Sequence, residues 1–366
     1  MHRRRPPFPL ARACVLAAAL AVAFPAAPAL ARLPSGFVGI ASEDVYYNAG
    51  VYRSQSLAAE RRAGVRLIRQ QFTWESIERS PGRYDLSYLD SYVGAAAANG
   101  IRLLPTLSDA PAFYERPTHQ RGFPPPRDYG KMAAFARVLV KRYGPRGSLW
   151  TLPQFSRYRR YAIRSWQIWN EPSLPVYWPP RPSAREYARL LKVVGRAIKR
   201  EDRRAEIVTA GLPNSKLPGA VPPTRFIAAL YRYAGRSAFD TLAFNAYARD
   251  ARELRGLLFA IRRVMNSRGD RRAPIWITEL GWGDRGPRHR FIVGARGQAR
   301  RISSSFRLIQ QLRRRLRIRG LVYFSWRDLP QYGRGDLWGL HTGLLRLDGS
   351  RKPAYQAFVR AVRGFR

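Results

Sequence analysis

Short apolar runs alternate with longer amphipathic stretches along most of this chain. Eight runs have the length and composition of strands: residues 37–41, 65–70, 101–107, 163–169, 206–210, 241–245, 274–279 and 320–325. Between and after them, apolar positions recur at helical spacing in residues 55–63, 86–99, 128–143, 183–200, 223–235, 251–267, 296–317 and 352–363. Continuous apolar strands that alternate with helices are typical of a parallel sheet buried on both faces.

Eight strand–helix pairs is also the number that closes a (β/α)8 barrel. We therefore predict an α/β fold, a single (β/α)8 TIM barrel, over residues 32–366. A doubly wound open sheet is the alternative. Nucleotide-binding sheets of that kind carry a glycine-rich turn after their first strand, and nothing resembling it follows residues 37–41.

Residues 1–31 have the composition of a cleaved signal peptide. Their basic start holds four arginines, Arg3, Arg4, Arg5 and Arg12. An apolar run over residues 13–24 follows, and Ala29-Leu30-Ala31 is a small-x-small cleavage sequence. An uncleaved anchor is disfavoured because the run is short and Pro25 interrupts it. We therefore expect a secreted or envelope-associated protein without an integral membrane segment in its mature chain.

The chain is strongly basic, with 66 Lys and Arg against 24 Asp and Glu and a net charge of +42. One interpretation is attraction to an anionic polysaccharide or cell-wall polymer. The other is arginine on ordinary solvated helix faces, as in residues 313–319, where Ile302, Phe306 and Ile309 occupy the opposite side. No recognition motif accompanies the dispersed charge, so we expect no nucleic acid partner.

Two short segments carry the candidate chemistry. Trp166-Gln-Ile-Trp-Asn-Glu-Pro172 ends the fourth predicted strand, and Trp276-Ile-Thr-Glu-Leu-Gly-Trp282 ends the seventh. In a barrel, the carboxyl ends of all strands open onto one face, so Glu171 and Glu279 should meet there. Two carboxyl groups at one site supply the acid and the nucleophile or base that cleave a glycosidic bond. The alternative for each glutamate is a solvated surface position.

Neighbouring residues suggest different roles for the two glutamates. Arg69 and the Tyr247 hydroxyl, at the ends of the second and sixth strands, would favour an ionised Glu279, the better nucleophile. Tryptophans around Glu171 would favour its protonated form, the better general acid. Asn170 can hydrogen-bond a sugar hydroxyl. Arg69 as a structural ion-pair partner and Tyr247 as a core residue are the alternatives.

Aromatic residues near the same strand ends are candidate sugar platforms, with burial in the core as the alternative. They are Trp326, Trp282 and Trp74, and also Trp338 and Tyr114. The three histidines after residue 31 lie in predicted loops without metal-ligand spacing, so we expect no metal and no cofactor.

Taken together, these motifs resemble the clan A retaining glycoside hydrolases, most closely the branch of β-xylosidases, α-L-iduronidases and cellulase-like bacterial relatives. The resemblance covers roughly residues 36–363 and rests on Trp169-Asn-Glu-Pro172, Thr278-Glu-Leu-Gly-Trp282, Gly64–Arg69 and Phe324-Ser-Trp326. It implies Glu171 as acid/base, Glu279 as nucleophile and Asn170 as the partner of the sugar 2-hydroxyl. The histidines that many relatives carry near strands 3 and 6 are replaced here by residues 106–110 and 245–247, so the resemblance does not name the sugar.

The resulting hypothesis is a secreted retaining glycoside hydrolase that cleaves the O-glycosidic bonds of an oligo- or polysaccharide by double displacement. A transglycosylase would use the same residues with a sugar as acceptor. A non-catalytic carbohydrate-binding barrel at the cell envelope is the alternative of another class.

Overall fold

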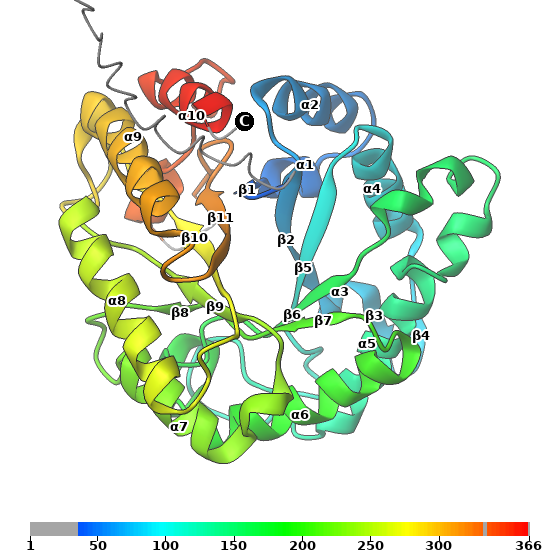
Figure 1. Cartoon of the computed structure of the whole chain (residues 1–366). Coiled ribbons are helices and arrows are strands. Elements are labelled where there is room, and N and C mark those ends of the chain that lie inside the picture. Colours follow the sequence, from blue (N-terminus) through cyan, green and yellow to red (C-terminus); the bar gives the residue numbers. More distant parts are fainter. Residues whose placement is uncertain (1–35, 332–334, 365–366) are drawn as a thin grey trace, which may run out of the picture. The chain divides into compact units, whose positions relative to one another are not determined.

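The computed structural model describes residues 36–331 and 335–364 of the chain. Parallel strands form one curled sheet in the order β7-β6-β5-β2-β1-β11-β10-β9-β8, and Figure 1 shows helices arranged around it. The strands are β1 Val38–Ala41, β2 Leu67–Thr73, β5 Arg102–Ser108, β6 Ser165–Ile168, β7 Glu206–Val208, β8 Leu212–Pro213, β9 Leu242–Asn245, β10 Ile275–Leu280 and β11 Ile318–Phe324. The predicted parallel α/β architecture is therefore confirmed.

Eight longer helices follow the predicted amphipathic stretches. They are α2 Gly50–Ala63, α4 Ser87–Ala98, α5 Tyr129–Tyr143, α6 Ala184–Glu201, α7 Pro223–Ala234, α8 Ala251–Ser267, α9 Gly294–Leu312 and α10 Pro353–Gly364. Polar caps fix several starts: the Asp250 carboxylate accepts from the Glu253 amide at 2.9 Å, and Ser183 caps α6 in the same way. Two ends differ from the prediction by five residues: α2 begins at Gly50 rather than at 55, and α9 ends at Leu312 rather than at 317. The other ends agree to within two residues.

Short elements complete the fold. They are α1 Glu43–Tyr47, α3 Trp74–Ile77, the hairpin β3 Glu78–Ser80 and β4 Arg83–Tyr84, and the 3-10 helices Ser148–Thr151, Ser156–Tyr161, Pro175–Tyr177, Arg236–Ala238 and Trp338–His341. The sequence predicts none of them, because elements of two to six residues carry no measurable periodicity.

The predicted fifth strand, residues 206–210, is interrupted in the structure. β7 ends at Val208, which pairs with Gln167 of β6 and also bridges to Thr241, whereas the short β8 pairs with β9. Gly211 lies between the two pieces, where an added Cβ would be 2.1 Å from the Asn245 side-chain oxygen. The interruption therefore makes room for Asn245 at the carboxyl end of the sheet.

Two layers of apolar side chains hold the sheet. The inner layer takes one residue from each of seven strands, Ala41, Leu67, Leu104, Val208, Ala243, Trp276 and Val322. A much larger cluster lies between the strands and the surrounding helices. Burial of the strands on both faces explains why their sequences are continuous apolar runs.

The predicted signal peptide, residues 1–31, lies outside the described residues. Within the part of the chain that the structure describes, no helix is long and apolar enough to cross a membrane.

Candidate active site

A sharp turn after β6 carries Asn170 and Glu171 toward the carboxyl end of the sheet. Trp169 and Glu171 both have left-handed backbone conformations, with φ of 70° and 43°. Non-glycine residues in this region cost roughly 1–3 kcal/mol each and cluster at functional sites. The Trp169 amide donates to Leu107 O at 2.8 Å, and its indole donates to Tyr177 O at 2.8 Å. These two contacts hold the turn in place.

Arg69, from β2, connects three of the site residues. Its Nη1 lies 2.9 Å from Glu279 Oε1, and its Nη2 lies 2.9 Å from Asn170 Oδ1. Its Nε donates to Gln167 Oε1 at 2.7 Å. Arg69 is 9% exposed, so a buried, planar cation fixes Glu279 and Asn170 relative to each other. The predicted proximity of Arg69 to Glu279 is present in the structure.

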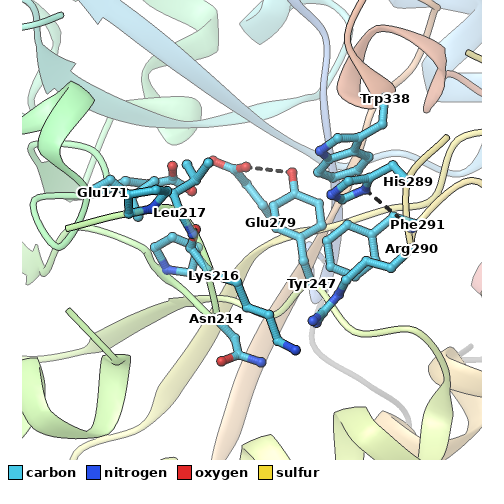
Figure 2. Close-up of a pocket in the computed structure, with 14 residues that line it drawn as sticks. Glu171, Asn214, Lys216, Leu217, Tyr247, Glu279, His289, Arg290, Phe291 and Trp338 are labelled. Atoms are coloured by element: carbon cyan, nitrogen blue, oxygen red, sulfur yellow. Dashed lines mark hydrogen bonds between the residues drawn. The ribbon is translucent and has the colours of Figure 1, made fainter. Parts of the chain in front are cut away.

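Glu279 lies near the end of β10 and accepts a second hydrogen bond on its other oxygen. The Tyr247 hydroxyl donates to Oε2 at 2.7 Å (Figure 2). Burial, and then the negative charge of Glu279, raises the pKa of Tyr247 well above its usual value, so Tyr247 stays a neutral donor. A carboxylate that accepts on both oxygens from a cation and a phenol fits the ionised form, since a protonated carboxyl must donate from one oxygen.

Glu171 shares the site but has a different environment. Burial, and then the negative charge of Glu279, raises the pKa of Glu171 to about 8. The Asn245 amide opposes this by donating to Glu171 Oε1 at 2.7 Å, and Thr278 Oγ1 fixes that amide by donating to Asn245 Oδ1 at 2.8 Å. Glu171 therefore holds its proton at neutral pH, while it remains within reach of an ionised neighbour.

A cavity of about 430 Å³ opens beside the two glutamates. Its floor includes Tyr247, and its walls come from the loop after β8, residues 213–218, and the loop after β10, residues 289–291 (Figure 2). Trp338 also lines it, stacked on His289 at 5.2 Å between ring centroids and packed edge-on against Tyr247 at 5.0 Å. An apolar wall next to two carboxyl groups suits a sugar ring, which presents both hydroxyls and C–H faces.

The other predicted tryptophan platforms are deeply buried. Trp282 is 0% exposed and donates to Ala248 O at 2.7 Å. Trp74 is also 0% exposed and stacks on Phe135 of α5 at 5.3 Å. Trp326 is 1% exposed and packs against Tyr355 at 5.9 Å. None of the three lines the cavity beside the glutamates, so their contact with sugar stays a prediction, whereas Trp338 does line it.

Besides the loop residues that line the cavity, four residues near the two glutamates escaped the sequence analysis. Gln167 and Asn245 orient Arg69 and Glu171, and Tyr177 lies near both catalytic candidates, since their charges contribute to raising its pKa. Glu43, in α1, is the fourth: burial, and then the charge of Glu279, raises its pKa to about 7. A glutamine within the apolar run Trp166-Gln-Ile-Trp was a visible signal for Gln167, because buried polar residues need partners.

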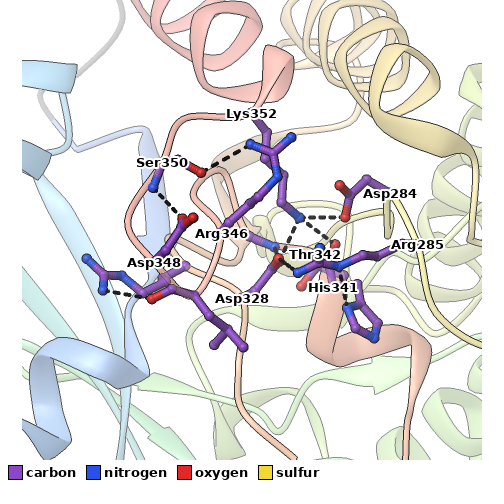
Figure 3. Close-up of polar contacts among 12 residues, drawn as sticks. Asp284, Arg285, Asp328, His341, Thr342, Arg346, Asp348, Ser350 and Lys352 are labelled. Atoms are coloured by element: carbon purple, nitrogen blue, oxygen red, sulfur yellow. Dashed lines mark hydrogen bonds and ion pairs between the residues drawn. The ribbon is translucent and has the colours of Figure 1, made fainter.

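The loops after β10 and β11 are tied together behind the site by a buried lysine (Figure 3). Lys352 Nζ lies 2.6 Å from Asp284 Oδ1 and 2.7 Å from Asp328 Oδ1, and it donates to His341 O at 3.1 Å. Asp284 follows Trp282 by two residues, and Asp328 follows Trp326 by two residues. The start of α10 therefore anchors the chain segments that leave the two tryptophans.

Among residues 36–331 and 335–364, no group of three or more His, Cys, Asp or Glu side chains could hold a metal ion. The expectation that the protein needs no metal or cofactor stays a prediction.

Comparison with known proteins matches the fold to that of glycoside hydrolases. No protein-family model matches the chain, and a comparison with curated proteins found no match. Among solved structures, a family 39 glycoside hydrolase from Bacteroides cellulosilyticus WH2 is 20% identical with a TM-score of 0.64, over 90% of this chain and 64% of that chain. A monomeric beta-xylosidase from Caulobacter crescentus CB15 is 19% identical with a TM-score of 0.63, over 90% and 69% of the two chains.

A glycoside hydrolase of another family shares the fold over nearly its whole length. The GH53 catalytic domain from Ignisphaera aggregans is 17% identical with a TM-score of 0.61, and the match covers 90% of this chain and 97% of that one. The chain spans less than two thirds of some neighbours, 64% of the Bacteroides enzyme and 65% of a GH39 enzyme from Xanthomonas axonopodis pv. citri. At these identities the likeness concerns the fold, and for the fold the predicted resemblance is confirmed.

Proposed function

We propose that this chain is a retaining glycoside hydrolase that cleaves O-glycosidic bonds of an oligo- or polysaccharide. One observation carries the proposal: two buried carboxyl groups line one cavity, one with a pKa raised to about 8 and the other accepting hydrogen bonds from Arg69 and Tyr247. Pairs of carboxyls whose environments differ in this way mark the acid and the nucleophile of glycosidases.

In the first step, Glu279 attacks the anomeric carbon and forms a glycosyl ester as the bond to the leaving oxygen breaks. Glu171 gives its proton to that oxygen. In the second step, Glu171 takes a proton from water while the water oxygen attacks the anomeric carbon, and Glu279 leaves as a carboxylate. Asn170, held by Arg69, is oriented for the sugar 2-hydroxyl next to the reacting carbon.

The scaffold that we propose is a closed (β/α)8 barrel in which β7 and β8 together occupy the fifth strand position. The bridge from Val208 to Thr241 and the pairing of β8 with β9 support this arrangement. Glu171 and Tyr247 then follow the ends of β6 and β9, and Asn245 and Glu279 lie at the ends of β9 and β10, where barrel enzymes place their chemistry. Arg69 reaches them from within β2. Secretion and attraction to an anionic polysaccharide remain parts of the proposal, supported by residues 1–31 and the net charge of +42.

Labelling with a panel of mechanism-based glycosidase probes of different sugar configurations tests the proposal. Intact mass is measured for the wild type and for Glu279→Gln. We expect one probe to add its mass to the wild type only, which would establish the nucleophile and the retaining mechanism together. If no probe labels the folded wild type, a carbohydrate-binding barrel without catalysis becomes the better account. Product analysis with an added sugar acceptor separates hydrolysis from transglycosylation.

A further inference from the structure

The cavity beside the glutamates has a cationic wall. Lys216, from the loop after β8, and Arg290, from the loop after β10, both line it. Figure 2 shows the charged ends of the two side chains extending toward the same side of the cavity, with Asn214 next to Lys216. Two separate loops therefore bring positive charge to one place.

The two cations are not neutralised by carboxylates of the cavity. Its only acidic lining residues are Glu171 and Glu279, and Glu279 is paired with Arg69. Lys216 is exposed and forms no ion pair within the part of the chain that the structure describes. Arg290 is anchored from outside the cavity, because its Nη2 lies 3.1 Å from Glu253 Oε1 and its guanidinium covers the Phe291 ring at 4.8 Å.

Arg290 differs from an ordinary surface arginine because its side chain is held in place. One side of the Arg290 guanidinium is committed to Glu253, and its buried Nε has no hydrogen-bond partner among the described residues. A held guanidinium loses less side-chain entropy when it binds an anion than a free one does. Asn214 and Ser215, which also line the wall, add neutral hydrogen-bonding groups.

Carboxyl side chains gather on the opposite side of the site. The sheet order β5-β2-β1 places Asp109, Glu75 and Glu43 just after three neighbouring strand ends. Asp109 is 7% exposed, and burial, and then the charge of Glu75, raises its pKa to about 7. Carboxyl groups, whether ionised or protonated, do not attract an anionic sugar. The cations of the cavity wall therefore favour the side of Lys216 and Arg290 for an anionic group.

We propose that the substrate carries an anionic group, a carboxylate, sulfate or phosphate, on the sugar that departs as the leaving group, and that Lys216 and Arg290 bind it. The proposal rests on the proposed function, which assigns Glu171 to the leaving oxygen. The cavity is lined by Glu171 and Leu174, and also by Glu279 and Tyr247, so it extends from the reacting carbon past Glu171. Asn170 and Arg69, which we assign to the reacting sugar, do not line it. A chain that leaves past Glu171 would therefore run along the Lys216 wall.

Paired ligands test the charge directly. Calorimetry measures the binding of ligand pairs to the mature Glu171→Gln protein. Oligogalacturonate, oligomannuronate and glucuronoxylo-oligosaccharide are each compared with their own methyl ester. Sulfated and phosphorylated oligosaccharides are compared with their unsubstituted forms. The same pairs are measured after adding Lys216→Gln or Arg290→Gln. Lys141→Gln is the matched control, because it removes the same charge from an exposed residue in the last turn of α5.

We expect at least one anionic ligand to bind more tightly than its neutral partner, and Lys216→Gln to reduce that preference about fivefold, the size of a partly exposed ion pair. Lys141→Gln should leave the preference unchanged. The class of the preferred ligand distinguishes carboxylate from sulfate and phosphate. Absence of any anion-selective pair overturns the proposal, and so does an equal effect of Lys216→Gln and Lys141→Gln, which would indicate diffuse charge.

The side of the scissile bond is read from the products. A form of the preferred ligand that carries a single anionic group is hydrolysed by the wild type in ¹⁸O-water. The label enters the new reducing end, so mass spectrometry must find the anionic group on the unlabelled fragment. An anionic group on the labelled fragment contradicts the proposal. Probe labelling of Glu279 is independent of this result, so the anion site can fail while the glycosidase assignment stands.

Discussion

At the residue scale, the raised pKa of Glu171 makes a prediction about pH. The first step of the proposed mechanism needs a protonated Glu171, and its pKa of about 8 keeps the proton on below that pH. We therefore expect kcat/KM to fall about tenfold per pH unit above pH 8, since a single group is losing its proton. A pH–rate profile on the substrate identified by the probe panel measures this. An alkaline limb near pH 5 would mean that the buried Glu171 is ionised in the free protein.

Tyr247 offers a conservative test of how Glu279 is held. Tyr247→Phe removes the hydroxyl that lies 2.7 Å from Glu279 Oε2 and leaves the ring packed on Trp338. A hydrogen bond to a charged group contributes about 1.5–3 kcal/mol, so we expect glycosyl-enzyme formation to slow about 10- to 100-fold. Stopped-flow burst kinetics measures that step, with circular dichroism to check the fold. An unchanged rate would assign Tyr247 to the core, the alternative that its sequence position left open.

At the scale of elements, Gly211 connects the interrupted fifth strand to the chemistry. An alanine Cβ there would lie 2.1 Å from Asn245 Oδ1 and 2.8 Å from Thr278 Oγ1, both buried. We expect Gly211→Ala to displace the Asn245 amide from Glu171. Because that hydrogen bond lowers the pKa of Glu171, its loss should move the alkaline limb of the pH–rate profile upward. Gly256→Ala, on α8 with no atom near its added Cβ, is the control and should leave the limb in place.

The contacts of Lys352 predict that it stabilises the loops that follow β10 and β11. Lys352→Met leaves the buried Asp284 without its cation and leaves Asp328 with only Arg285, at 3.4 Å. Breaking a buried pair costs about 3–5 kcal/mol. Urea unfolding should show that loss in the free energy of unfolding. The exposed Lys141→Met variant should change it by less than about 0.5 kcal/mol. Equal stability of the two variants would mean that the lysine network does not hold the loops.

Comparison of sequence and structure shows which elements and residues the pattern of apolar positions can predict. All eight predicted strands overlap observed ones, because strands buried on both faces need apolar side chains throughout. Glu171 and Glu279 could be predicted from the sequence for the same reason, because each of these polar residues interrupts such an apolar run. The break after Val208 could not be predicted from the sequence, because it depends on the approach of Asn245, more than thirty residues away along the chain. Glu43 was missed because α1 is too short for a pattern.

At the scale of the whole molecule, the positive net charge contrasts with the acidic residues on one side of the site. The chain has a net charge of +42, yet Glu43, Glu75 and Asp109 gather on one side of the site. Dispersed surface charge acts over about a Debye length, roughly 8 Å at physiological salt, whereas a bound ion pair acts by contact. The proposed attraction to an anionic polymer and the proposed selection at the cavity can therefore be tested separately.

That separation predicts two different responses to salt. Retention of the mature wild type on an immobilised anionic polysaccharide should weaken steeply as NaCl rises from about 50 to 500 mM, because long-range attraction is screened. Lys216→Gln should elute at nearly the same salt as the wild type, since it removes one of the 62 Lys and Arg left when the four in residues 1–31 are subtracted from 66. Its loss of anion preference at the cavity should nevertheless persist at any salt at which binding is measurable. A large decrease in the salt concentration at which Lys216→Gln elutes would instead make the cavity wall the main polymer contact. The remaining arginines would then be ordinary residues of solvated helix faces, the alternative that their spacing also allows.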